Sequence, residues 1–148
     1  MEMKSRRSIQ VTIGAMKACF FWVAALLLFE ATAFASNGVK KNEAYYQAIA
    51  ADKLGGETEV TMGDRTRCDI VTETHAIEVD FKQKWGEAVG QSLNYGFQTD
   101  KKAGIVLIVE NKDDIRELIR LRSIIRHYGL PIALWMMDKT NYELKLFL

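Results

Sequence analysis

The sequence predicts an α/β fold of three layers, with a mixed β-sheet between helices. Stretches within 57–82 alternate apolar and polar side chains, which is typical of strands joined by tight turns. After them, helical patterns separate two continuously apolar stretches, 103–109 and 132–137, as expected for parallel strands that helices connect. The chain of 148 residues, 49% hydrophobic and 26% charged, is long enough for one domain with a core.

The N-terminal part of the chain has the pattern of a secretory signal peptide. A basic stretch comes first, an apolar run follows at 18–29, and the small-residue site Ala33-Phe34-Ala35 ends the pattern. The apolar run is shorter than the roughly 20 residues that a membrane-spanning helix needs. We therefore expect residues 1–35 to be a signal peptide that is cleaved on export.

Cleavage leaves residues 36–148 as a single domain, periplasmic or secreted, with no attachment to the membrane. The alternatives are a membrane anchor, if the segment stays uncleaved, and a cytoplasmic protein, if the start is misassigned. Met16, shortly before the apolar run, is a second candidate start. The charges of the remaining domain nearly balance, which excludes a uniformly basic nucleic-acid binder but not a local basic face.

The first half of this domain predicts a helix followed by three strands. Residues 42–54 have helical spacing and end at a Gly-Gly pair, which is a common helix stop. Strands at 57–62 and 65–72 meet across a Gly-Asp turn pair. A third strand at 75–82 alternates again, with apolar side chains on one face and charged side chains on the other.

The second half predicts alternating helices and strands. Helical spacing at 85–97 precedes the apolar strand at 103–109, and an amphipathic helix at 113–128 ends at a glycine. The apolar strand at 132–137 follows a proline, and residues 142–147 add an edge strand. A helix that connects two parallel strands crosses over the sheet, so we expect the charged face of the third strand to be covered.

Charged side chains on strands that should be buried mark the candidate site. Asp69 lies among apolar residues of the second strand, where antiparallel pairing would bring it opposite the third strand. Glu78, Asp80 and Lys82 share one face of that third strand. Carboxylates gathered there raise one another's pKa unless a cation lies between them, and oxygen ligands suit Mg²⁺ or Mn²⁺. The alternative is an ordinary solvated face of the sheet.

These residues resemble the motifs of a known family, the PD-(D/E)XK nuclease superfamily, and in particular its RecB-like branch with a Gln-x-x-x-Tyr element. The matching motifs are Asp69, the run Glu78-Val79-Asp80-Phe81-Lys82 and the element Gln91-Ser92-Leu93-Asn94-Tyr95. The element order expected between residues 43 and 109 also resembles the αβββαβ core of that superfamily. The resemblance implies a three-layer restriction-endonuclease-like fold and a nuclease that depends on Mg²⁺ or Mn²⁺.

The resemblance also implies which side chains hold the metal. Asp69 and an acidic residue of the third strand, either Glu78 or Asp80, would bind the ion. Glu43, at the start of the first helix, would be a further ligand, as in several nucleases of the superfamily. The alternative role of Glu43 is a favourable interaction with the helix dipole.

The identity of the catalytic lysine stays open between two registers. Asp80-x-Lys82 fits the acid-x-Lys step of the family directly. In the other register the acid lies two residues earlier, and Lys84 would supply the amine from a shifted position. The resemblance implies that Gln91 and Tyr95 line the site from the next helix. One turn apart, they could equally be an ordinary pair on a helix surface.

The function that these residues imply is hydrolysis of nucleic-acid phosphodiester bonds through a metal-bound water, with DNA favoured over RNA. The alternative is a catalytically inactive module on the same fold that binds nucleic acid or a protein. Lys112, Arg116 and Arg120 form a basic stripe that would suit such binding, although many such stripes are only solvated faces. Because the domain is small, we expect a homodimer or a partner protein to complete the substrate groove.

Overall fold

The computed structural model describes residues 41–110 and 115–148, so the expected signal peptide lies outside the described residues. The α/β class with a mixed sheet is confirmed. The elements are, in chain order, α2 (Glu43–Leu54), β1 (Glu57–Thr61), β2 (Arg67–Val71), β3 (His75–Phe81), the 3-10 helix η1 (Lys82–Lys84), α3 (Trp85–Thr99), β4 (Lys102–Val109), α4 (Arg116–Tyr128), β5 (Ile132–Asp138) and β6 (Leu144–Leu146).

The six strands form one sheet in which every strand lies beside its neighbours in sequence, in the order β1-β2-β3-β4-β5-β6. The pairs β3–β4 and β4–β5 are parallel, and the helices α3 and α4 connect them. The three remaining pairs are antiparallel. The carboxyl ends of the three parallel strands therefore meet at one edge of the sheet, the location at which α/β proteins commonly bind ligands.

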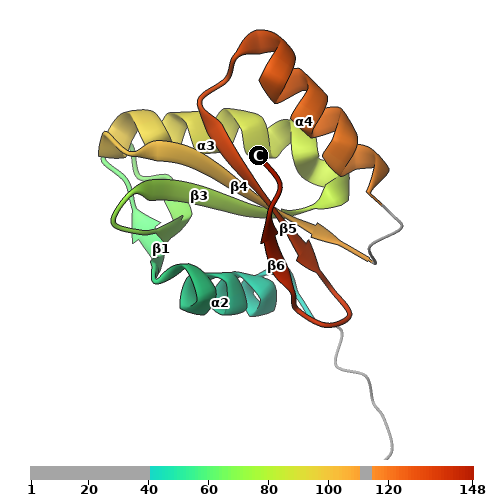
Figure 1. Ribbon diagram of the computed structural model, residues 1–148. Coiled ribbons are helices and arrows are strands. Elements are labelled where there is room, and N and C mark those ends of the chain that lie inside the picture. The colour runs from blue at the N-terminus through green and yellow to red at the C-terminus, as the bar shows by residue number, and fades with distance from the viewer. Residues whose placement is uncertain (1–40, 111–114) are drawn as a thin grey trace, which may run out of the picture. The chain divides into compact units, whose positions relative to one another are not determined.

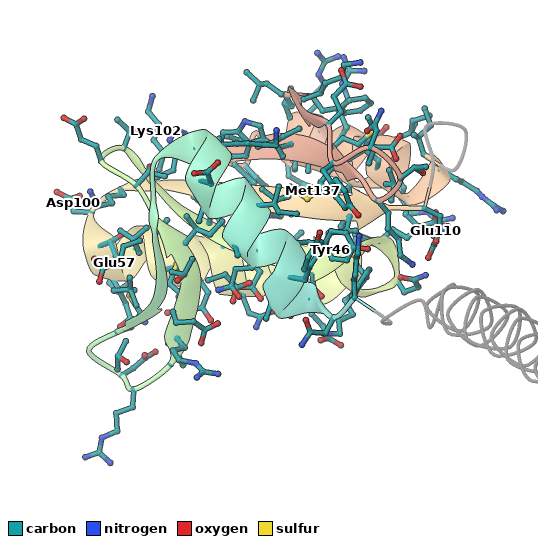
Figure 2. The ribbon with its side chains drawn as sticks, turned by 90° about the horizontal axis from the view of Figure 1, so that it is seen from below. Tyr46, Glu57, Asp100, Lys102, Glu110 and Met137 are labelled. Atoms are coloured by element: carbon teal, nitrogen blue, oxygen red, sulfur yellow. The ribbon has the colours of Figure 1, made fainter. Side chains whose placement is uncertain are left out.

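Helices cover both faces of the sheet (Figure 1). On one face, Tyr46 and Ala50 of α2 pack against Ile77 and Val79 of β3. Figure 2 looks onto this face, with α2 in front of the sheet and Tyr46 labelled. On the other face, α3 and α4 pack on the sheet through a second cluster of buried residues. That cluster includes Ala88, Leu118, Leu121, Ile125, Ile105, Leu107 and Leu134.

Local sequence signals explain where α2 begins and ends. The Asn42 side chain caps the helix by accepting a hydrogen bond of 3.2 Å from the backbone N–H of Tyr45. Gly55 ends it in the left-handed conformation, with φ of 67°, which glycine adopts without steric cost. Among the described residues, no helix is both long enough and apolar enough to cross a membrane.

The boundary of β3 differs from the expected one in a way that matters for the site. The alternating pattern predicts a strand through Lys82, but β3 ends at Phe81 and the chain turns into η1. Lys82 is polar and therefore continues the alternation, so periodicity alone cannot reveal that the strand has ended. The described part of the helix expected at 113–128 begins at Arg116, and its first two expected residues lie outside the described residues.

Candidate active site

Two acidic residues of β3 are buried beneath the helices. Ile77 and Val79 point toward α2, so Glu78 and Asp80 point toward the opposite face of the sheet, the face that α3 covers. The exposed fraction of Glu78 is 6% and that of Asp80 is 2%. The prediction that a crossover helix covers this charged face is confirmed, and the alternative of a solvated face is wrong for these two residues.

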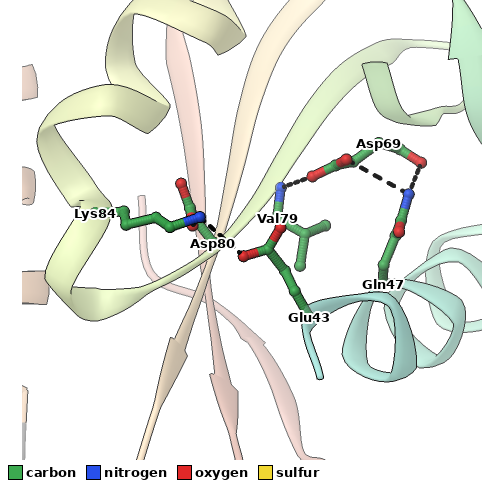
Figure 3. Close-up of polar contacts among 6 residues, drawn as sticks. All are labelled: Glu43, Gln47, Asp69, Val79, Asp80 and Lys84. Atoms are coloured by element: carbon green, nitrogen blue, oxygen red, sulfur yellow. Dashed lines mark hydrogen bonds and ion pairs between the residues drawn. The ribbon is translucent and has the colours of Figure 1, made fainter. Parts of the chain in front are cut away.

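Asp69 reaches β3 through its side chain where the two strands stop pairing. The register of β2 with β3 joins Ile70 to Ile77 and Val71 to Ala76, and it does not extend to Asp69. The Asp69 carboxylate instead accepts a hydrogen bond of 2.8 Å from the backbone N–H of Val79 (Figure 3). The Asp69 side chain thus takes the place of a backbone acceptor from the neighbouring strand. The hydrogen bond fixes its carboxylate at Val79, the residue between Glu78 and Asp80.

Gln47 of α2 is a functional candidate that the sequence analysis missed. Its amide nitrogen donates to the backbone oxygen of Asp69 at 2.8 Å and to Oε1 of Glu59 at 2.9 Å. It also lies 3.5 Å from Oδ1 of Asp69 (Figure 3). Gln47 follows Glu43 by four residues, so both side chains lie on one face of α2. That spacing places Gln47 beside Glu43 but does not reveal its contacts with Asp69 and Glu59.

Lys84 connects two of the predicted site residues that are far apart in sequence. Its ammonium nitrogen lies 3.2 Å from Oδ1 of Asp80 and 3.3 Å from Oε2 of Glu43 (Figure 3). Glu43 belongs to the first turn of α2, on the opposite face of the sheet from α3. The contacts therefore bring together the end of β3, η1 and the start of α2 at the carboxyl edge of the parallel strands.

Burial raises the pKa of the three strand carboxyl groups. The pKa of Asp69 rises to about 6, although the hydrogen bond from Val79 opposes the rise. The pKa of Asp80 also rises to about 6 by burial, against the opposing effect of Lys84. For Glu78, burial and then the charges of Asp69 and Asp80 raise the pKa to about 9. Without a cation between these groups, Glu78 therefore holds a proton at neutral pH.

The two candidate lysines differ in their surroundings. Both lie in η1, Lys82 at its start and Lys84 at its end. Lys84 makes the contacts with Asp80 and Glu43, and these carboxylates raise its pKa above the usual value, Asp80 most strongly. Of the two registers left open by the sequence, these contacts favour the one in which Lys84 supplies the amine.

Gln91 and Tyr95 occupy adjacent turns of α3. Tyr95 is 4% exposed and packs with Cys68 of β2 and Ala76 of β3. Burial raises the pKa of its phenol to about 12, the charge of Glu78 adds to the rise, and Gln91 opposes it. Gln91 itself is exposed. Gln91 and Tyr95 are therefore not an ordinary pair on a helix surface, because Tyr95 is buried and lies within electrostatic range of Glu78 in β3.

The donor chemistry of this site fits a small divalent cation that oxygen atoms bind. The Oε2 atom of Glu78 is buried and has no hydrogen-bond partner among the described residues. Yet within residues 41–110 and 115–148, no three of the His, Cys, Asp and Glu side chains already converge as a metal-binding group. Mg²⁺ keeps several water ligands and is often bound by only one or two carboxylates, so the site does not require a complete cage.

Comparison with known proteins gives no match to a family model, to a curated protein or to a solved structure. The resemblance to the PD-(D/E)XK superfamily therefore stays a prediction that is based on the motifs. The geometry and electrostatics of the site itself are therefore the evidence for its function.

Proposed function

We propose that this protein is a metal-dependent nuclease that hydrolyses phosphodiester bonds of nucleic acid, with DNA as the preferred substrate. The observation that carries the proposal is the position of one ammonium group, that of Lys84, between carboxylates of two elements, Asp80 and Glu43. The same site includes the buried Glu78 carboxyl, whose Oε2 atom has no hydrogen-bond partner among the described residues. Strongly shifted pKa values next to a specific charge partner are typical of catalytic sites.

The acidic residues are the proposed metal ligands. Asp69, Glu78 and Asp80 would hold Mg²⁺ or Mn²⁺, with Glu43 as a further ligand. Such an ion would neutralise the carboxylates and stabilise negative charge that develops on the phosphoryl oxygens. The hydrogen bonds from Val79 and Gln47 hold Asp69 in one orientation, and a fixed ligand binds with less loss of conformational entropy.

Lys84 has the role of a positive charge rather than of a base. Its two carboxylate neighbours raise its pKa above the usual value, so the amine keeps its proton at neutral pH. An ammonium group in this position can bind a phosphate oxygen and offset the charge of the transition state. Asp69 and Asp80, with pKa values of about 6 before a metal ion binds, are deprotonated at neutral pH and can therefore act as oxygen ligands of the cation.

The experiment that tests this function is cleavage of labelled single-stranded and double-stranded DNA and RNA by the full chain. Each reaction is run with Mg²⁺, with Mn²⁺ and with EDTA, for the wild type and for Asp69→Asn and Asp80→Asn. The matched control is Asp64→Asn, which changes an exposed carboxylate that hydrogen bonds hold in a turn.

We expect metal-dependent cleavage that both site variants lose and the control retains. A folded wild type that cuts none of the four substrates with either metal would refute the nuclease. The catalytically inactive binding module would then be the better description of the chain.

A further inference from the structure

We propose that the outward face of α4, formed by Arg116, Arg120 and Arg126, binds the phosphate backbone of duplex DNA next to the candidate active site. This inference rests on the proposed function, because it names how the substrate of that site is held. The sequence alone indicates only a basic stripe on this helix.

The three arginines lie on the side of α4 that faces away from the sheet. Leu118, Leu121 and Ile125 of the same helix are buried in the core, whereas the three arginines are exposed. None of the ion pairs among the described residues involves these arginines. Their charges are therefore uncompensated within this part of the chain, unlike those of Lys84 or Lys139.

The start of α4 lies at the edge of the sheet that carries the candidate site. In the parallel pairing of β3 with β4, Phe81 at the end of β3 lies beside Ile108 near the end of β4. The helix α4 also contacts η1, the segment that carries Lys84. Given the rise of an α-helix, Arg120 lies about 6 Å and Arg126 about 15 Å farther along the axis than Arg116. The arginines thus form a row that leads away from the site.

The charge of the site itself makes cations outside it necessary. Three carboxylates, those of Glu43, Asp69 and Asp80, influence one another there, and Lys84 contacts two of them, Asp80 and Glu43. Before a metal ion binds, this group repels a polyanion. A row of uncompensated arginines at the same edge supplies the attraction that the site lacks.

The composition of the face favours duplex DNA over a single strand. Proteins that bind single strands combine cations with exposed aromatic rings on which bases stack. Between the arginines, the exposed residues of α4 are Ile119 and Ser123, and neither side chain is aromatic. The exposed rings of the helix, His127 and Tyr128, lie beyond Arg126 at its C-terminal end, where they contact each other. Between its arginines the face therefore offers contacts to phosphates without stacking, which suits a duplex whose phosphates point outward.

The test is the salt dependence of binding of a short labelled DNA duplex to the full chain, measured by fluorescence anisotropy in EDTA. The test variant combines Arg116→Gln, Arg120→Gln and Arg126→Gln. The matched control combines Lys53→Gln, Arg65→Gln and Lys102→Gln, three exposed cations that are not on α4. The three single arginine variants are measured as well, so that a combined variant that folds poorly does not decide the result.

We expect each arginine variant to reduce the slope of log affinity against log salt concentration by about 0.9, the value for one phosphate contact, and the control to leave the slope unchanged. An equal reduction in the control would overturn the inference, because the attraction would then be non-local. Unchanged duplex binding in the arginine variants would also overturn the inference. The same holds if the variants lose binding only to single-stranded DNA, RNA or poly-glutamate, measured in the same way; a loss of poly-glutamate binding would indicate an acidic protein partner.

The outcome is separable from that of the proposed function, because binding in EDTA does not require cleavage. A duplex bound through the arginines but never cut by the wild type would support the inference and refute the nuclease. Cleavage by the wild type with unaltered duplex binding in the arginine variants would support the nuclease and refute the inference.

Discussion

The carboxyl group of Asp64 and the strand carboxyl groups of the candidate site accommodate their charge in opposite ways. Asp64, in the turn between β1 and β2, accepts hydrogen bonds from the backbone N–H of Thr66 at 2.9 Å and from the side chains of Asn94 and Gln98 of α3. The bonds from Thr66 are the largest of the effects that lower the pKa of Asp64 to about 2. The strand carboxyls are instead buried, and their pKa values rise to between about 6 and about 9.

Asp64 is a carboxylate that serves the fold, whereas the strand carboxyl groups form a site that is suited to a ligand. Asp64 is stable as an anion and ties a turn to α3, so it needs nothing further. Glu78 loses its hydration without gaining a hydrogen bond for Oε2 among the described residues. Such an arrangement costs stability unless something binds to it, and folded proteins keep such costs mainly at functional sites.

Removing the cation of the site should produce the largest effect. We expect Lys84→Met to lower kcat for DNA cleavage by at least about a hundredfold, the cost of losing one electrostatic contact to the transition state. Lys82→Met should lower it much less, because the contacts with Asp80 and Glu43 belong to Lys84. Steady-state kinetics on both variants, with melting temperatures as a check on folding, measure the contrast.

Lys84→Arg is the control for that experiment, because it keeps the charge and should retain part of the activity. Equal losses of kcat in the Lys82 and Lys84 variants would contradict the assignment of the amine to Lys84.

The raised pKa of Glu78 predicts a dependence of stability on pH. Its pKa is about 9 in the folded chain, against a usual value of 4.5. Between these values the folded state holds a proton that the unfolded state has lost, so the free energy of unfolding falls as pH rises. The slope reaches at most about 1.4 kcal/mol per pH unit for one proton. Glu78→Gln should remove this slope.

Urea denaturation between pH 6 and pH 8.5 in EDTA tests that prediction, with the variant as the reference for all other titrating groups. Parallel curves for the wild type and the variant would mean that Glu78 binds the same number of protons in the folded and unfolded states, so that folding does not raise its pKa. Glu78 would then resemble Asp64 in being stable as an anion in the folded protein.

A divalent cation should stabilise the protein through the strand carboxyl groups and not through Asp64. Binding to the folded state only adds about 1.4 kcal/mol when Mg²⁺ is tenfold above its Kd. We expect this gain in the wild type and in Asp64→Asn, and no gain in Asp80→Asn. Urea denaturation with Mg²⁺, against NaCl of equal ionic strength, measures it. An equal gain in all three proteins would point to general screening of charge.

Hydrophobic periodicity was enough to predict the order of the elements in the described part of the domain. Each of the α helices and strands found between Glu43 and Leu146 overlaps an expected one, because one face or both faces of each element are apolar. The end of β3 could not be predicted, because Lys82 continues the alternation into η1. That single boundary also decided which lysine contacts Asp80.

The motif residues could be listed from the sequence, but their contacts could not. The contact of Glu43 with Lys84 joins residues 41 positions apart and depends on how α2 lies beneath the sheet. The role of Gln47 could not be predicted for the same reason, because its partners, Asp69 and Glu59, belong to strands that pack beside α2. Long-range packing creates these contacts, and no local pattern encodes it.

The smallest expected effect is that of Asp64→Asn, which removes the charge of a carboxylate that hydrogen bonds already stabilise. The pKa of Asp64 is lowered to about 2 from 3.8, so its stabilising effect is complete above the usual value and is lost as pH falls toward the folded value. We expect the variant to be slightly less stable at neutral pH, with part of the loss of stability between pH 4 and pH 2 removed. Thermal denaturation across this range measures the difference. Cleavage activity should be unchanged, and a loss of activity in this variant would mean that the turn, and not only the carboxyl edge of the sheet, contacts the substrate.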